Sequence, residues 1–162
     1  MATIVVPFRP NGKTRLGDAE LARAMFEDVL AACEPIGRTV VADAQGGQGD
    51  AVAAVLAGVQ GPVVIVNADV PCATTAEVEQ LLAAAPALVA ARDGTTNALA
   101  LRDARDFVPL YGPGSARRFS DQLGARSIDL PGLRDDVDTP EDVAHVTDRM
   151  GPRTRAVLKR TA

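Results

Sequence analysis

The chain has 162 residues, which is enough for one ordinary domain and gives no reason to expect a second. Hydrophobic residues make up 47% and charged residues 23%, so the composition suggests neither a disordered protein nor a membrane protein. The net charge of -4 and an aromatic content of 3% argue against nucleic-acid binding, which needs basic surface and rings that stack on bases.

Short apolar runs alternate along the chain with Ala- and Leu-rich segments of helical period, which predicts β-α units and a mainly parallel sheet. In the first half we expect strands at 3–6, 38–42 and 63–67 and helices at 18–33 and 50–57, with Asp18 as a helix cap. In the second half we expect strands at 87–91, 97–101 and 126–130 and helices at 75–84, 116–123 and from 139, capped by Thr75, Ser115 and Thr139. The fold class is therefore a three-layer α/β/α sandwich of Rossmann-like type. Residues 1–150 are expected to form a single domain, and 151–162 a basic, loosely held tail.

The N-terminal residues, the length of the apolar runs and the two cysteines predict an intracellular protein. Residues 1–7 lack the basic start and apolar segment of a secretory signal, and no apolar run reaches the length of a membrane span, so cytoplasm is the expected location. Cys33 and Cys72 lack metal-ligand spacing and are expected to be reduced packing residues. The one imidazole, His145, is expected on a helix surface, since nucleophilic catalysis has no further partners in this chain.

Two acidic clusters predict a metal site. Asp69 comes just past the strand at 63–67, and open parallel sheets place ligand-binding residues at the carboxyl ends of their strands. Asp136 and Asp138 are two residues apart, so in an extended segment both side chains point to one side and Asp135 faces away. Hard carboxylates suit Mg²⁺ that holds phosphates, and we predict that Asp69, Asp136 and Asp138 are its ligands. A turn acid and a helix-start acid are the alternative roles.

Two loops are candidates for nucleotide binding. The loop at 7–17 places Arg9, Lys13 and Arg15 between a strand and a helix, where cations and backbone N–H groups can hold a triphosphate. It is not a Walker loop, and a basic surface loop is the alternative. The glycine-rich segment at 46–50 could admit a base or ribose against bare backbone, or it could simply join a strand to a helix. The candidate residues in this segment are Gly47, Gly49 and Asp50.

Two further segments, at 93–97 and 111–115, supply glycines, hydroxyls and a helix N-terminus. These groups fit a small acidic or phosphorylated acceptor. A turn and a capped helix would explain both segments structurally.

Four segments in order carry a family resemblance: Ala-Asp-Val-Pro at 68–71, Asp-Gly-Thr-Thr-Asn-Ala-Leu-Ala-Leu at 93–101, Tyr-Gly-Pro-Gly-Ser at 111–115 and Asp-Val-Asp-Thr-Pro-Glu-Asp at 136–142. With them the chain resembles the guanylyltransferases of coenzyme F-420 biosynthesis, which join GTP to phosphoenolpyruvate, 2-phospholactate or a related phosphorylated three-carbon acid. The resemblance implies a shortened nucleotide-diphospho-sugar transferase-like fold, similar to that of molybdopterin guanylyltransferases.

The resemblance also implies roles for residues. Asp69, Asp136 and Asp138 would hold Mg²⁺, while Lys13 and Arg15 would hold the triphosphate and act with Asp69 in catalysis. The implied acceptor-binding residues are Thr96, Asn97, Gly112, Gly114 and Ser115. The expected partners are thus GTP and the phosphorylated acid, with no nucleic acid and no membrane, and a homodimer is left open.

One departure from the family keeps other functions open. The second strand is followed almost directly by the glycine-rich segment, so a β-α unit that the family carries between them is missing. A nucleotidyltransferase with a molybdopterin or sugar-phosphate acceptor is one alternative, because a fold does not fix its acceptor. A catalytically silent paralogue that binds a nucleotide is the other.

Overall fold

The computed structural model describes residues 1–10 and 18–161. The strands are β1 (Ala2–Phe8), β2 (Gly37–Asp43), β3 (Val63–Val66), β4 (Ala87–Ala90), β5 (Thr96–Leu101) and β6 (Arg126–Ser127). The α-helices are α1 (Ala19–Cys33), α2 (Gln48–Leu56), α3 (Thr75–Ala83), α4 (Ser115–Leu123), α5 (Pro131–Arg134), α6 (Pro140–Val146) and α7 (Pro152–Thr161). Two 3₁₀ turns are η1 (Ala104–Asp106) and η2 (Thr147–Arg149).

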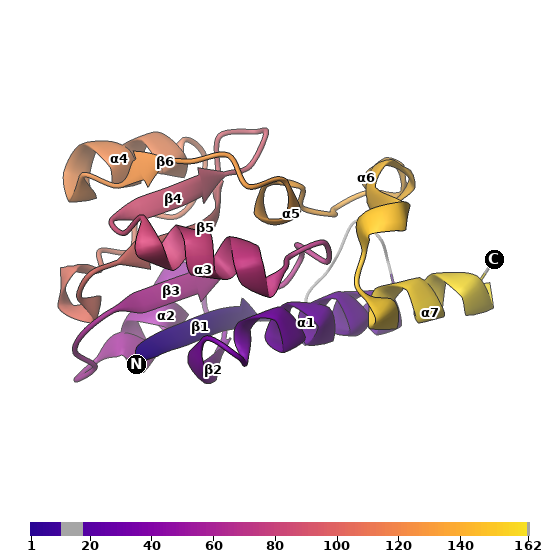
Figure 1. The fold of residues 1–162 in the computed structure, drawn as a ribbon, viewed down its shortest axis with the longest axis horizontal. Coiled ribbons are helices and arrows are strands. Elements are labelled where there is room, and N and C mark those ends of the chain that lie inside the picture. The colour runs from indigo at the N-terminus through magenta and orange to yellow at the C-terminus, as the bar shows by residue number, and fades with distance from the viewer. Residues whose placement is uncertain (11–17, 162) are drawn as a thin grey trace.

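The strands form one sheet in the order β2-β1-β3-β5-β4-β6 (Figure 1). β1 is parallel to β2 and β3, and β4 is parallel to β6, whereas β5 is antiparallel to both of its neighbours. The prediction of a mainly parallel sheet is therefore confirmed, with β5 as the exception. Because β5 is antiparallel to β3, its first residues, Thr96 and Asn97, lie at the end of the sheet where β1 and β3 have their carboxyl ends.

Helices cover both faces of the sheet, so the predicted three layers are present (Figure 1). Alternate residues of β3 face opposite layers: Val64 and Val66 pack with α1 and α3, while Val63 and Ile65 pack with α2 and α4. All four side chains are buried. This burial on both faces explains why the strand reads as a continuous apolar run.

The C-terminal segment is an ordered helix, and the expectation of a loosely held tail is wrong. Helix α7 packs along α1 beyond the carboxyl end of the sheet (Figure 1). Asp28 of α1 is buried and accepts hydrogen bonds from the N–H of Arg153 (3.2 Å) and from the N–H and hydroxyl of Thr154 (2.8 and 2.7 Å). A carboxylate on another helix thus satisfies the first N–H groups of α7, a contact that no local sequence pattern shows.

Helix caps were predicted with mixed success. Asp18 caps α1, accepting from the N–H of Leu21 at 3.0 Å, and Thr139 forms a capping box with Asp142 at the start of α6. The other two assignments are each one residue late: Thr74, not Thr75, caps α3, and Gly114, not Ser115, precedes α4. Gly114 has φ of 72°, a left-handed conformation that glycine adopts without strain.

Within residues 1–10 and 18–161 no helix is both long and apolar enough to span a bilayer. Cys33 and Cys72 are free and buried, as packing residues are expected to be. Strand β6 ends at Ser127, so it is shorter than the predicted run of 126–130.

Candidate active site

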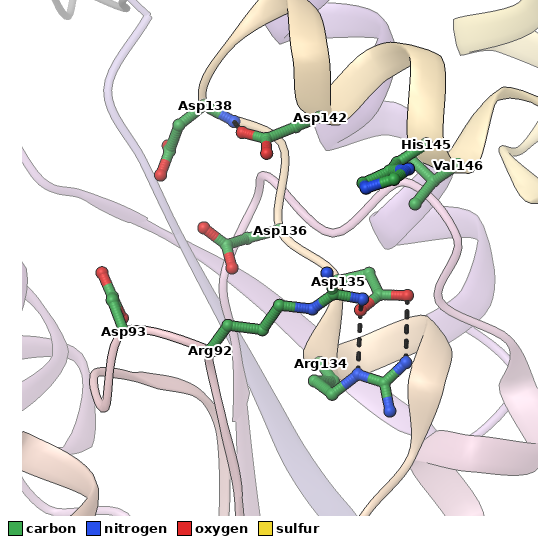
Figure 2. A pocket seen from close by; sticks show the side chains of 9 residues that line it. All are labelled: Arg92, Asp93, Arg134, Asp135, Asp136, Asp138, Asp142, His145 and Val146. Carbon is green, nitrogen blue, oxygen red and sulfur yellow. Dashed lines mark hydrogen bonds and ion pairs between the residues drawn. The ribbon is translucent and has the colours of Figure 1, made fainter.

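Three carboxylates meet at the sheet edge where β1 and β3 end. Asp69 lies on the turn after β3, whereas Asp136 and Asp138 lie on the segment between α5 and α6. One carboxylate oxygen from each lies within 4.8 Å of the others. Figure 2 shows Asp136 and Asp138, together with Asp93, pointing toward one space. The structure therefore brings together the three residues that the sequence analysis assigned to a metal.

Asp69 carries the most unusual charge environment of the cluster. Its Oδ1 is buried and has no hydrogen-bond partner in the described part of the chain. Burial, followed by the nearby charges of Asp136 and Asp138, raises the pKa of Asp69 from 3.8 to about 8. Leaving such an oxygen without a partner is unfavourable, and a hard divalent cation shared with two further carboxylates would remove the cost. The donor set thus fits Mg²⁺ on its chemistry.

The second acidic segment is tied to the sheet beside Asp69. The N–H of Val137 donates to the carbonyl of Asp69 at 2.9 Å. The side-chain amide of Asn97 donates to the carbonyl of Arg134 at 2.8 Å and to Oδ1 of Asp136 at 3.1 Å. Asn97, which was expected to touch the acceptor, is therefore placed where it orients a carboxylate of the cluster.

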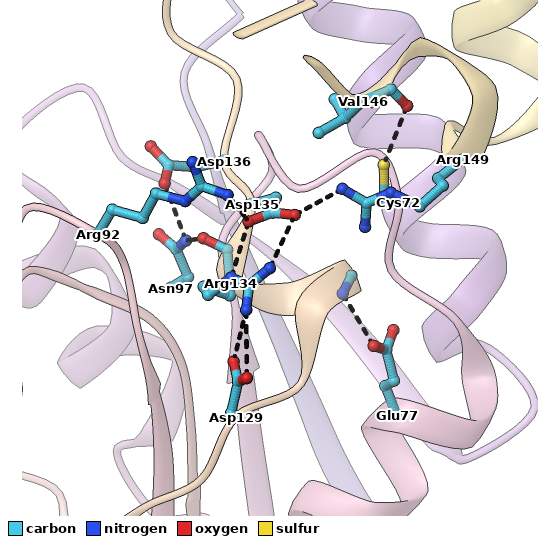
Figure 3. A network of polar contacts seen from close by, with 11 residues as sticks. Cys72, Glu77, Arg92, Asn97, Asp129, Arg134, Asp135, Asp136, Val146 and Arg149 are labelled. Atoms are coloured by element: carbon cyan, nitrogen blue, oxygen red, sulfur yellow. Dashed lines mark hydrogen bonds and ion pairs between the residues drawn. The ribbon is translucent and has the colours of Figure 1, made fainter.

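Asp135 faces away from the cluster, as the alternation of an extended segment predicts. Its side chain is 4% exposed and lies between three arginines (Figure 3). It accepts from Arg149 Nη2 at 2.6 Å, from Arg134 Nε at 2.9 Å and from Arg92 Nη2 at 3.3 Å. Burial alone would raise the pKa of Asp135, but the hydrogen bonds from Arg134 and Arg149 outweigh it and lower that pKa to about 2. Asp135 therefore stays ionised.

A pocket opens beside the carboxylates (Figure 2). It is lined by Arg92, Asp93, Arg134, Asp135, Asp136, Asp138, Asp142, His145 and Val146. His145 lies on α6 as expected, but its helix borders this pocket. Asp142 was expected as the acid of the capping box at the start of α6, and it has that role here. Arg92 was not predicted to belong to the site, because nothing local in the sequence distinguishes it from a surface charge.

The basic loop after β1 is only partly described. Arg9 lies at the carboxyl end of β1, and its Nε donates to the carbonyl of Ala44 at 3.1 Å, just past β2. Lys13 and Arg15 lie outside the described residues. The chain places β2 on one side of β1 and β3 on the other, so Arg9 and Asp69 flank the point where the strand order reverses. Ligands of open α/β sheets bind at such points.

The glycine-rich segment differs from the expectation at one position. Gly47, with φ of 117°, precedes α2, and no atom lies within 4 Å of where its Cβ would be. At Gly49, by contrast, a Cβ would lie 2.9 Å from Cβ of Pro109. The missing side chain of Gly49 accommodates a neighbouring loop, so it does not offer bare backbone to a nucleotide. Asp50 is exposed in the first turn of α2.

A chain of side-chain hydrogen bonds links the elements around the site. Gln48 Nε2 donates to Asn67 Oδ1 at 2.6 Å, and Asn67 Nδ2 donates to the carbonyl of Thr96 at 3.1 Å. The hydroxyls of Thr96 and Ser115 are buried and lie 2.9 Å apart. These two hydroxyls bond to each other, joining the start of β5 to the start of α4. Gln48 was not predicted to belong to the site, because its only local signal is its place between two glycines.

Gly112 and Gly114 lie in a loop that the side chain of Arg118 holds in place. Gly112 has φ of 116° and Gly114 φ of 72°. The Arg118 guanidinium donates to the carbonyl of Leu110 at 2.8 Å and to that of Pro113 at 2.5 Å. This arginine therefore fixes the loop that was expected to bind the acceptor.

Comparisons with known proteins give a consistent picture. No family model matches the chain. A phosphoenolpyruvate guanylyltransferase of Streptomyces scabiei is 32% identical over 209 positions, which cover 98% of this chain and 96% of the relative. A protein of the same name from Nocardia farcinica is 40% identical over 103 aligned positions, and the match covers 57% of this chain and 44% of that protein. This match, like most others, spans about half the length of the relative.

The match to the Streptomyces protein covers more positions than the 162 residues of this chain, so the relative carries additional segments. This agrees with a shortened chain. A solved structure from Desulfovibrio desulfuricans G20, assigned to the nucleotide-diphospho-sugar transferases, aligns with a TM-score of 0.70. Its identity is 18%, and the alignment covers 98% of this chain and 94% of that one. The fold class inferred from the sequence is thereby confirmed.

Proposed function

This chain belongs to the phosphoenolpyruvate guanylyltransferase family, and we propose that it transfers GMP from GTP to a phosphorylated three-carbon acid, releasing pyrophosphate. Phosphoenolpyruvate is the acceptor that the names of the relatives favour, and 2-phospholactate is the second candidate. The place of this reaction is the biosynthesis of coenzyme F-420. The observation that carries the proposal is the cluster of Asp69, Asp136 and Asp138 at the reversal point of the sheet.

Mg²⁺ is the cofactor that this cluster fits. The unpaired Oδ1 of Asp69 and one oxygen each from Asp136 and Asp138 are the ligands that we assign to it. When bound there, the ion supplies positive charge to the phosphoryl oxygens at the reacting centre. The protein contributes the fixed positions of the three carboxylates, which the hydrogen bonds from Val137 and Asn97 maintain.

The reaction is an in-line displacement at the α-phosphorus of GTP. A phosphate oxygen of the acceptor forms the new P–O bond, the bond to the β-phosphate oxygen breaks, and pyrophosphate leaves with that electron pair. Because the attacking phosphate is already anionic, no general base has to remove a proton. Catalysis then consists of bringing two anions together in line and stabilising the charge that develops. A site without a catalytic histidine meets these requirements.

The remaining groups of the site divide between the two substrates. Arg9, together with Lys13 and Arg15 of the same loop, is assigned to the triphosphate, because it lies where β1 ends. The loop at 111–115, fixed by Arg118, is assigned to the acceptor together with the start of β5. The hydroxyls of Thr96 and Ser115 form a hydrogen bond with each other. Either hydroxyl could bind the acceptor only by replacing this hydrogen bond with one to the acceptor.

Two observations favour a second candidate, a nucleotide-binding paralogue without transferase activity. Gly49 packs against Pro109 and so does not offer its own backbone to a base, and the chain is shorter than the Streptomyces relative. Such a protein would bind GTP but release no pyrophosphate with any acceptor.

The test is pyrophosphate release from GTP and Mg²⁺, with phosphoenolpyruvate, 2-phospholactate and 3-phosphoglycerate in separate reactions and a reaction without acceptor. We expect release with phosphoenolpyruvate. Asp69→Asn should abolish it, whereas Asp121→Asn, on the exposed face of α4, should leave it unchanged. Silence of the folded wild-type protein with all three acids, combined with measurable GTP binding, would establish the paralogue instead.

A further inference from the structure

The segment that carries Asp136 and Asp138 has to hold two carboxylates close to a third. Binding a cation requires all three to be ionised, and like charges at this separation repel one another, so the segment is then under a force that moves it away from Asp69. The geometry therefore requires anchors elsewhere in the segment. At its far end, Asp142 accepts hydrogen bonds from the N–H groups of Asp138 and Thr139, each at 2.9 Å.

The near end is anchored by Asp135. This carboxylate is in contact with three arginines that come from three different places in the fold: Arg92 after β4, Arg134 at the end of α5 and Arg149 in η2 (Figure 3). It thus joins the sheet, α5 and the C-terminal helices at one point. Breaking a buried, paired charge of this kind is strongly unfavourable, so Asp135 has one stable orientation.

Orientation is transmitted to the cluster by the backbone. Successive side chains of an extended segment point to opposite sides, so a fixed Asp135 directs Asp136 and Asp138 to the other side, toward Asp69. The arginines also neutralise Asp135, which therefore adds little negative charge to the three carboxylates. We propose that Asp135, held by Arg149 and Arg134, is a positioning residue that sets the divalent-cation affinity of the Asp69, Asp136 and Asp138 site.

The inference rests on the proposed function, since it presupposes a cation at this site. It is tested by binding of Mn²⁺ to the purified protein, measured by titration calorimetry and by the loss of the free-ion paramagnetic resonance signal. Changes in residues that orient metal ligands typically weaken metal binding about 10–100-fold, and we expect a shift in that range for Asp135→Asn. Arg149→Gln should produce a smaller shift in the same direction, and Arg149→Lys, which keeps the charge, should restore part of it.

The matched control is Asp28→Asn. Asp28 is also a buried, hydrogen-bonded aspartate, but it joins α1 to α7. Both Asp→Asn variants should lower the melting temperature, whereas only Asp135→Asn should weaken Mn²⁺ binding. If Asp135→Asn fails to fold, the Arg149 pair of variants decides the matter.

Two results would overturn the inference, and they are distinguishable. Wild-type protein that binds no Mn²⁺ would overturn the metal assignment of the proposed function and this inference with it. Wild-type protein that binds Mn²⁺, with Asp135→Asn and Arg149→Gln matching its affinity within about twofold, would overturn this inference alone.

Discussion

The main-chain N–H of Val137 donates a 2.9 Å hydrogen bond to the carbonyl oxygen of Asp69, although the two residues are far apart in the sequence. Val137 lies between the metal-ligand candidates Asp136 and Asp138, and its bond joins their segment to the third candidate, Asp69. The distance between the two acidic segments is therefore set by a backbone hydrogen bond. The orientation of the carboxylates is set in addition by the contacts of Asn97 and of Asp135.

Asn97→Ala should weaken the site without unfolding the protein. The substitution removes the amide that donates to Asp136 Oδ1 and to the carbonyl of Arg134, so both acceptors lose a partner. We expect a loss of about 1–3 kcal/mol in the free energy of unfolding. We also expect a rise in the Mg²⁺ concentration needed for half-maximal pyrophosphate release. Gln60→Ala, at an exposed position, is the control and should change neither quantity. An unchanged Mg²⁺ requirement in Asn97→Ala would show that Asn97 does not orient Asp136.

Asp69 should make the metal-free protein less stable as the pH rises. Burial and the charges of Asp136 and Asp138 raise its pKa from 3.8 to about 8, so between these values the folded state binds a proton that the unfolded state does not. Stability from this group is thus fully present below pH 3.8 and is lost as the pH rises through about 8. The measurement is urea unfolding with chelator across this range, for wild type and Asp69→Asn. The difference between the two curves isolates Asp69, and a difference independent of pH would contradict the assignment.

Stabilisation by Mg²⁺ should grow with pH in the same window. The ion and the proton compete for Asp69, so the cation binds the folded protein more tightly once the carboxyl has lost its proton. The rise in melting temperature on adding Mg²⁺ is therefore expected to be larger at about pH 8 than at about pH 6. In Asp69→Asn the rise should be small at both pH values. Equal shifts in the wild type at both would mean that no proton is displaced from Asp69.

The bond between the hydroxyls of Thr96 and Ser115 should be detectable as an energetic coupling. Both groups are buried, so Ser115→Ala leaves the Thr96 hydroxyl without this partner. We expect each of Ser115→Ala and Thr96→Val to reduce the free energy of unfolding by about 1–3 kcal/mol. The double variant should lose less than the sum, because no hydroxyl then remains unpaired. Additive losses in chemical denaturation of the four proteins would refute the coupling.

Gly49→Ala should be destabilising, and Gly46→Ala should be nearly neutral. The new Cβ at position 49 would lie 2.9 Å from Cβ of Pro109, whereas nothing lies within 4 Å of the one at position 46. Crowding of this kind costs about 1–3 kcal/mol. Thermal unfolding of both variants checks the expectation. If the two melting temperatures fall equally, the packing of Gly49 on Pro109 does not matter for stability.

The order of apolar runs was enough to predict the six strands and the layers of this fold, but not the helices α5 and α7. The strand at 63–66 is apolar on both faces because helices cover both, so its sequence reports its burial directly. Asp69 and Asp138 can be connected from the order of the elements alone, because the ends of parallel strands and the helix starts that follow them meet at one edge. The three metal-ligand candidates were therefore accessible from the sequence.

Features that depend on a single dihedral angle or on contacts between distant residues could not be predicted from the sequence. The assignment of Ser115 as a cap is wrong because Gly114 takes the left-handed conformation and leaves the serine hydroxyl to bond Thr96. The tail was judged by its charge, yet the buried carboxylate of Asp28 orders α7.

Local patterns along the chain specify which residues lie at the ends of the strands, since alternation and apolar runs are direct consequences of burial. The direction of β5, which brings Asn97 to the edge where β3 ends, is instead a result of tertiary packing. The same holds for the convergence of Arg92, Arg134 and Arg149 on Asp135. Strand direction and the meeting of distant charges are set by how the layers pack, and no periodicity along the chain encodes either of them.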